Sequence, residues 1–176
     1  RLGEVVARRL ASATTAGLNT IRSGIQIRFS AVTTCKNDLP SRHEVVDLFA
    51  GPGGLDVGAQ WLGMKTTGIE LDRNACATRA SAGLLTVQGD VRDFGPHDFP
   101  DVSTSLAMFE DERTVLVLEP LRCTLQAIRL KRPYEAVVME QVPAVLPIWQ
   151  AIRTVLERQG YGSDCGILRT EQFGVP

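Results

Sequence analysis

The sequence predicts an α/β fold: a Rossmann-like, doubly wound sheet whose strands are mostly parallel. Strand-like and helix-like patterns alternate along most of the chain. The apolar run Val45–Leu48 leads into a glycine-rich turn and then a helical pattern. Three successive apolar runs also end in or beside an acid, at Asp47, Glu70 and Asp90. In such sheets the carboxyl ends of the strands form the ligand-binding edge, so these acids predict a pocket for a nucleoside.

The glycine-rich turn is the most informative segment. Glycines adopt backbone conformations that are closed to other residues, and they let a ligand approach the backbone closely. The helix predicted over 55–62 would begin beside this turn with unpaired N–H groups, which suit an anionic group. Counting from Gly51, Asp56 stands where the fingerprint G-x-G-x-x-G has its third glycine. The turn therefore does not fit a nicotinamide dinucleotide.

Several segments together resemble the DNA (cytosine-5) methyltransferases. The segment Asp47–Gly54, with the sequence DLFAGPGG, is similar to the first motif of that family. Gly68–Asp72 and Gly89–Phe94 are similar to the second and third motifs. The later matches are Asp111–Arg113 with Leu116 and Glu119 for the fifth motif, Glu140–Val142 for a Glu-Asn-Val motif, and Gln172–Pro176 for the start of the eighth. The resemblance covers roughly residues 44–176.

The resemblance implies a methyltransferase-type fold with S-adenosylmethionine as cofactor and S-adenosylhomocysteine as product. Phe49 would pack on the adenine, Glu70 would bind the ribose, and the backbone of Gly51–Leu55 would hold the methionine part. The implied cofactor-binding residues are Asp47, Phe49, Ala50, Gly51, Gly53, Gly54, Leu55, Glu70, Leu71, Asp90, Val91 and Phe94. Judged from the residues alone, an aromatic face, a backbone nest and an acid suit any adenosine, so an adenine nucleotide stays open.

The resemblance implies two catalytic residues, Glu140 and Arg113. Glu140 follows the apolar run Tyr134–Met139, which we interpret as a buried parallel strand. Partial burial raises the pKa of a carboxyl group, which suits proton transfer near neutral pH. By resemblance, Glu140 would contact ring nitrogen 3 of a cytosine that has left the base stack. The alternative is an acid at a strand end that caps the following helix.

The family's nucleophile is a cysteine in a Pro-Cys pair after the fourth strand, and this chain has no such pair. We expect its four cysteines to be incidental or packed thiols: Cys35, Cys76, Cys123 and Cys165. The fourth strand should begin near 99–102, where the following Ser-Thr-Ser run leaves too few apolar residues for a buried strand. We therefore expect a chain break between Val102 and Ser103, with a loop omitted there; the alternative is a protein that lacks the loop.

We expect two parts of unequal size. Residues 1–43 would form a helix, a linker and a short strand at 25–29, and residues 44–176 would form the cofactor-binding catalytic domain. Arg1–Leu10 has one apolar face and is similar to the end of the family's tenth motif, which suggests a circularly permuted order. An ordinary amphipathic helix is the alternative. Further helices are expected at 72–83, 110–130 and 143–159, and a late strand at 164–168.

The composition limits the possible partners. A protein that binds nucleic acid over its whole surface is usually strongly basic, whereas this chain has a net charge of −1. The resemblance nevertheless implies double-stranded DNA as substrate, with the target-recognition domain unseen or on a second chain. No apolar run is long enough to span a membrane, and no Cys or His spacing suits a metal, so we expect neither. Unpatterned cysteines favour a reducing interior, and we expect a bacterial cytoplasmic protein associated with the nucleoid.

The resemblance thus implies a DNA cytosine-5 methyltransferase, as in bacterial restriction-modification systems. Two alternatives keep the cofactor: an inactive S-adenosylmethionine-binding scaffold or half of a split enzyme, and a tRNA cytosine-5 methyltransferase. A small-molecule or nucleotide-binding α/β protein is a further alternative.

Overall fold

The computed structural model describes residues 25–31, 44–108, 116–141 and 143–167. They form one seven-stranded sheet with the order β4-β3-β2-β5-β6-β1-β7. Neighbouring strands from β4 to β6 pair in parallel, and β1 pairs antiparallel with both β6 and β7. The strands are β1 Ile25–Ala31, β2 Glu44–Leu48, β3 Lys65–Glu70, β4 Thr86–Gln88, β5 Val102–Met108, β6 Ala136–Gln141 and β7 Tyr161–Ile167. This arrangement confirms the predicted fold class, a Rossmann-like, mostly parallel α/β sheet.

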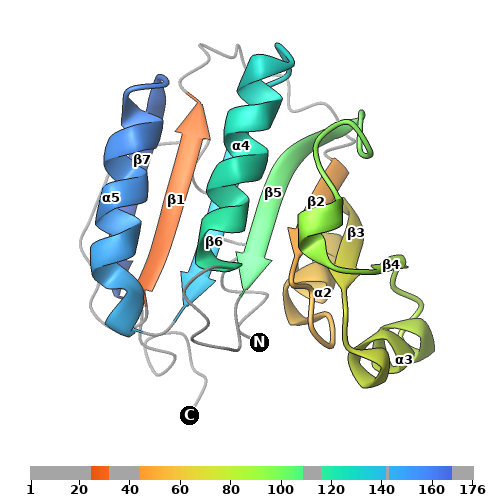
Figure 1. The fold of residues 1–176 in the computed structure, drawn as a ribbon. Helices are drawn as coiled ribbons and strands as arrows, with labels where there is room; N and C mark the ends of the chain where they lie inside the picture. The colour runs from red at the N-terminus through yellow and green to blue at the C-terminus, as the bar shows by residue number, and fades with distance from the viewer. Residues whose placement is uncertain (1–24, 32–43, 109–115, 142, 168–176) are drawn as a thin grey trace.

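Helices cover both faces of the sheet (Figure 1). They are α2 Gly54–Trp61, α3 Arg73–Ser81, α4 Glu119–Arg129 and α5 Leu146–Glu157, with short 3-10 turns η1 Val91–Asp93, η2 Leu116–Leu118 and η3 Pro143–Val145. Successive residues of a strand point to opposite faces. Val46 and Leu48 therefore join the core under α4 and α5, whereas Val45 joins the smaller core under α2. Asp47 alternates with Val46 and Leu48, so it also faces α2.

The helices predicted over 55–62, 72–83 and 143–159 are confirmed with small changes at their ends. Helix α3 begins one residue after Asp72, whose Oδ1 accepts a hydrogen bond from the Ala75 N–H at 2.8 Å. This side-chain cap explains the boundary. The expected helix over 110–130 is described only from Leu116, and it is regular from Glu119 after a 3-10 turn. At the C-terminal end, β7 begins at Tyr161, earlier than expected.

The polar run that we judged unfit for the fourth strand does form it, while the loop expected between Val102 and Ser103 stays a prediction. β5 spans Val102–Met108 in the centre of the sheet, between β2 and β6, and its register against β2 shifts at Ser103, since Glu44 pairs with Val102 and Val45 with Thr104. Thr104 and Ser105 are buried there beside Leu106 and Ala107. Backbone pairing with a strand on each side holds this segment in place, so small polar side chains suffice where we required a longer apolar run.

The N-terminal part of the chain contributes to the same sheet. β1 includes the expected strand at 25–29 and lies between β6 and β7. The two ends of the described chain are thus neighbours in the sheet, as a permuted order requires. The helix expected over 1–10 lies outside the described residues, and permutation stays a prediction.

Candidate functional site

The glycine-rich turn between β2 and α2 adopts an unusual backbone. Phe49, Gly51 and Gly53 all have positive φ angles, of 62°, 50° and 102°. A Cβ atom on Gly53 would lie 2.2 Å from Cδ1 of Leu84, so the position also lacks room for a side chain. Gly53 forms the N-cap of α2 without a side-chain hydrogen bond, and a Cβ on Gly54 would meet no atom within 4 Å. The start of α2 is therefore open to a ligand that accepts hydrogen bonds from N–H groups.

Glu70, at the end of β3, ties the turn to the sheet. Its Oε2 accepts a hydrogen bond from the Gly51 N–H at 2.7 Å, and its Oε1 accepts one from the Asp72 N–H at 2.7 Å. The backbone N–H of Ala50 donates to the Ile69 carbonyl at 3.0 Å. A carboxylate oxygen can accept more than one hydrogen bond, so Glu70 retains acceptor capacity for a ligand hydroxyl.

Asp90 follows β4 and lies close to Glu70, because the Gly89 N–H donates to the Glu70 carbonyl at 2.9 Å. Oδ1 of Asp90 accepts from the Arg92 Nε at 2.9 Å, and Oδ2 accepts from the Arg92 Nη2 at 2.5 Å. The side chain of Arg92, followed by its backbone N–H, lowers the pKa of Asp90 to about 2. Asp90 is thus a stable anion that a ligand would share with Arg92.

The structure places the other predicted cofactor residues in two groups. The side chains of Asp47, Ala50, Leu55 and Val91 are buried, so a ligand could meet only their backbone atoms. Phe49 and Phe94 are partly buried and pack against the main core. Leu71 has 63% of its surface exposed beside Glu70. The open edge is therefore formed by the turn, Glu70, Leu71 and Asp90.

Glu140 lies at the same edge of the sheet as the turn. Leu48 of β2 pairs with Ala107 of β5, which in turn pairs with Met139 of β6. Glu140 therefore follows Met139 at the level where Phe49 follows Leu48. The side chain is half-buried, and this burial raises the pKa of Glu140. Arg113, the other predicted catalytic residue, lies outside the described residues.

The thiols that the structure describes are not activated. Burial raises the pKa of Cys123 to about 11, and it also raises the pKa of Cys76 and of Cys165. A nucleophilic cysteine needs the opposite shift, toward the thiolate. The expectation that these three are not nucleophiles agrees with their surroundings, while Cys35 lies outside the described residues.

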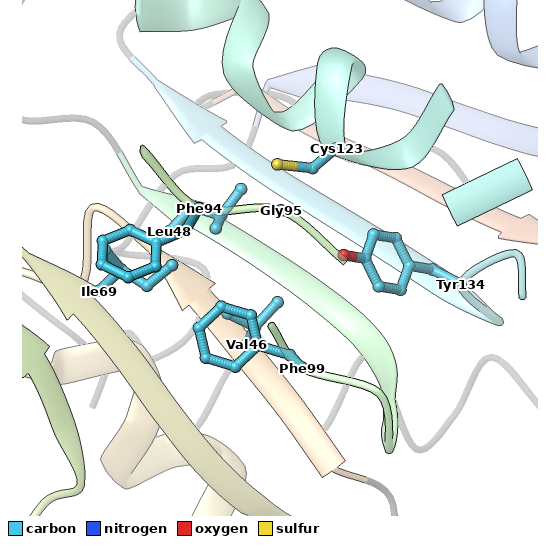
Figure 2. Close-up of a pocket in the computed structure, with 8 residues that line it drawn as sticks. All are labelled: Val46, Leu48, Ile69, Phe94, Gly95, Phe99, Cys123 and Tyr134. Carbon is cyan, nitrogen blue, oxygen red and sulfur yellow. The ribbon is translucent and has the colours of Figure 1, made fainter. Parts of the chain in front are cut away.

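A small apolar hollow lies on the face of the sheet that α4 covers, between β2, β3 and α4. Figure 2 shows its lining. The lining residues are Val46, Leu48, Ile69, Phe94, Gly95, Phe99, Cys123 and Tyr134. They leave no space for even a water molecule, and most belong to the main core. The hollow is therefore packed interior, and of the predicted cofactor residues only Phe94 reaches it.

The sequence gives no sign of two arginines that support the turn and its neighbouring loop. Arg79 of α3 is completely buried and pairs with Asp56 of α2 at 2.6 Å. Arg122 of α4 donates from Nη2 to the carbonyl groups of Val91, at 3.2 Å, and Phe94, at 2.7 Å. An arginine in a polar helix normally indicates a solvent-facing residue. Only Asp56, an acid two residues after the glycine-rich turn, hinted at an unusual local partner.

Neither a metal site nor a membrane span is found in the described ranges. No group of three or more His, Cys, Asp or Glu residues among them could hold a metal ion. No described helix is both long and apolar enough to cross a bilayer.

Comparisons with known proteins point to methyltransferases. No family model matches the chain. The chain is 26% identical over 159 residues to the Type II methyltransferase M.NgoFVII of Neisseria gonorrhoeae, covering 80% of this chain and 42% of that protein. It thus spans less than half the length of this curated relative.

Solved methyltransferase structures also align with parts of the chain. The glycopeptide N-methyltransferase MtfA aligns at 18% identity and a TM-score of 0.42, over 69% of this chain and 50% of that one. An S-adenosylmethionine-dependent methyltransferase from Mesorhizobium loti aligns at 21% identity and a TM-score of 0.39, over 51% and 43% of the two chains.

Proposed function

We propose that the chain is the S-adenosylmethionine-binding domain of a DNA cytosine-5 methyltransferase, of the kind found in bacterial modification systems. The observation that carries this proposal is the open edge, where Glu70 accepts a hydrogen bond from Gly51 and Asp90 lies beside it. The similarity to a Type II methyltransferase supports a DNA substrate. A substrate duplex and a target-recognition domain, here or on a second chain, belong to the same proposal.

The edge fits the chemistry of the cofactor. Glu70 would accept hydrogen bonds from the ribose hydroxyls, and Asp90 would accept one from the amino group of adenine. The uncapped N–H groups at the start of α2 would receive the carboxylate of the methionine part, and the open space above Gly54 would admit it. When bound, S-adenosylmethionine supplies an electrophilic methyl group.

Glu140 would act on the target base. Its raised pKa favours the protonated carboxyl, which can donate a hydrogen bond to ring nitrogen 3 of cytosine. That contact withdraws electrons from the ring and makes carbon 6 easier for a thiolate to attack. The base must leave the duplex to reach this edge.

The state of the cysteines favours a second candidate function. Since every described thiol has a raised pKa, none of them suits attack on carbon 6. The nucleophile would come from outside the described residues or from a second chain. The second candidate is therefore a cofactor-binding scaffold, or one half of a split methyltransferase.

The test is transfer of a labelled methyl group from S-adenosylmethionine to duplex DNA, with tRNA as a competing substrate. Incorporation into DNA that excess tRNA does not suppress supports the proposal. Incorporation into tRNA instead would indicate the RNA-modifying branch. Cofactor binding without any transfer would favour the scaffold or split enzyme, and an absence of both would reject the proposed function.

A further inference from the structure

Arg79 makes an unusually complete set of contacts beneath the glycine-rich turn. Its side chain is 0% exposed. Nε donates to Oγ1 of Thr86 at 2.8 Å, and Nη2 donates to the Leu85 carbonyl at 3.1 Å. Nη1 donates both to Oδ2 of Asp56 at 2.6 Å and to the carbonyl of Ala50 at 3.1 Å. One guanidinium therefore joins α3, the approach to β4, the start of α2 and the turn.

The surrounding backbone leaves room for this guanidinium and little else. A Cβ on Gly68 of β3 would lie 2.1 Å from Nη2 and 2.5 Å from Cζ of Arg79. Gly68 has no positive φ angle, so space rather than backbone conformation requires glycine there. A Cβ on Gly53 would lie 3.3 Å from Nη1. The guanidinium thus packs tightly between the sheet and the turn.

The charges explain why the arginine stays buried. Asp56 is also 0% exposed and pairs directly with Arg79. The second buried acid, Asp47, receives no hydrogen bond from an N–H or O–H group in the part of the chain that the structure describes. Burial, and then the charge of Asp56, raise the pKa of Asp47 well above its usual range. A protonated Asp47 leaves Asp56 and Arg79 as a compensated pair.

The turn needs this support because its backbone is strained. Phe49, with a φ angle of 62°, adopts a left-handed conformation that a bulky residue rarely takes. The N–H of Gly51 is held by Glu70, and the N–H of Ala50 is held by Ile69. The carbonyl of Ala50 accepts two hydrogen bonds: one from the Gly53 N–H within the turn, at 3.0 Å, and one from Nη1 of Arg79 beneath it, at 3.1 Å.

We propose that Arg79 is a positioning residue: anchored by Asp56, it holds the Ala50 carbonyl so that the turn keeps its ligand-binding shape. This assignment rests on the proposed cofactor site. This role predicts that two effects can be separated by mutation: loss of the buried ion pair with Asp56 and loss of the contact with the Ala50 carbonyl. Replacing both partners by apolar residues removes the buried charges together, which is often tolerated. It also removes the side-chain donor that ties the Ala50 carbonyl to α3 and leaves that carbonyl to the Gly53 N–H.

The experiment compares wild type with the double variant Asp56→Leu/Arg79→Met. Met is unbranched and suits the space of the arginine stem. Chemical denaturation measures stability, calorimetry measures affinity for S-adenosylhomocysteine, and hydrogen exchange without ligand measures opening at Ala50 and Gly51. The control is Arg73→Met, an exposed arginine on the same helix. We expect the double variant to be more stable than Arg79→Met alone, yet to bind at least tenfold more weakly and exchange faster at both amides.

The outcomes are distinguishable. A folded double variant with wild-type affinity and wild-type exchange would overturn the positioning role. If wild type itself does not bind S-adenosylhomocysteine, the proposed function fails, and exchange alone decides: faster exchange in the double variant supports the role of Arg79, and equal exchange refutes it. Should the double variant not fold, Arg79→Lys takes its place, since it keeps the charge beside Asp56 but lacks the planar fork of donors. The same two readouts then apply.

Discussion

Glu140 lies at the carboxyl edge of the sheet in an environment that differs from that of an ordinary surface carboxyl group. Its pKa is raised by burial, and the strand register puts it level with the glycine-rich turn. We expect Glu140→Gln to lower methyl transfer to DNA by at least about 100-fold, because the amide cannot transfer a proton. Cofactor affinity should stay nearly unchanged.

The control for this variant is Asp101→Asn, an exposed acid just before β5 and hence at the opposite edge of the sheet. It should leave both transfer and affinity unaltered. Equal losses of transfer and cofactor affinity in Glu140→Gln would show that Glu140 supports the fold rather than the reaction.

Asp47 gives a pH dependence with a definite sign. Its pKa is raised in the folded protein, first by burial and then by Asp56, while Arg79 opposes the shift and Glu70 adds to it. Asp47 therefore contributes stability that is complete below its unfolded pKa, near 3.9, and is lost as the pH rises toward the folded value. One proton changes the free energy of unfolding by about 1.4 kcal/mol per pH unit.

The matching variant is Asp47→Asn, a neutral residue of the same shape. Urea denaturation from pH 4 upward should show a steeper loss of stability in wild type than in the variant. Parallel curves for the two proteins would mean that Asp47 ionises normally in the folded state.

At the scale of single residues, the sequence predicted which residues gather at the carboxyl edge of the sheet, but not the arginine that supports the turn. Gly51, Glu70 and Asp90 were predictable because strand-end acids and glycine turns mark a ligand edge in this fold class. Arg79 was not, because a charged residue in a polar helix carries no sign of burial. Its burial depends on Asp56 and on the missing side chain of Gly68, which only the folded chain brings together.

Among the elements, β3 and α3 come into close contact beside the turn, at Gly68 and Arg79. A Cβ on Gly68 would overlap the Arg79 guanidinium, which is fixed by its other hydrogen bonds and cannot move aside cheaply. We expect Gly68→Ala to destabilise the protein by about 1–3 kcal/mol, as other overpacked substitutions do. Thermal or urea denaturation measures this change.

Gly54→Ala is the matched control for stability, because a Cβ at that position meets nothing within 4 Å. Its free energy of unfolding should change by less than about 0.5 kcal/mol. If both variants are equally stable, then the contact between β3 and α3 is looser than the structure indicates.

The elements also show where sequence patterns fail. Helix α3 was predictable from its capping acid Asp72, α5 from its apolar periodicity, and β2 from its apolar run. β5 was not, because Thr104 and Ser105 are buried in a central strand. A central strand gains hydrogen bonds along both sides, so its position in the sheet outweighs the polarity of individual side chains.

For the whole molecule, the main finding is a single sheet whose carboxyl edge gathers residues from β2, β3, β4 and β6. β1 joins that sheet between β6 and β7, which no pattern in the sequence foretold, since the partners of a short strand depend on contacts distant in the chain. The separate N-terminal part that we expected therefore contributes to the same core layer. The proposed cofactor site lies at the other half of the sheet, around β2 and β3.

Calorimetric titration of the chain with S-adenosylhomocysteine, repeated with Glu70→Ala, tests the proposed cofactor site most directly. We predict one-to-one binding to wild type and at least a tenfold loss in the variant, because the ribose loses a charged acceptor and the turn loses its bond at Gly51. Wild type that does not bind, or a folded Glu70→Ala variant that binds equally well, would contradict a cofactor site at this edge.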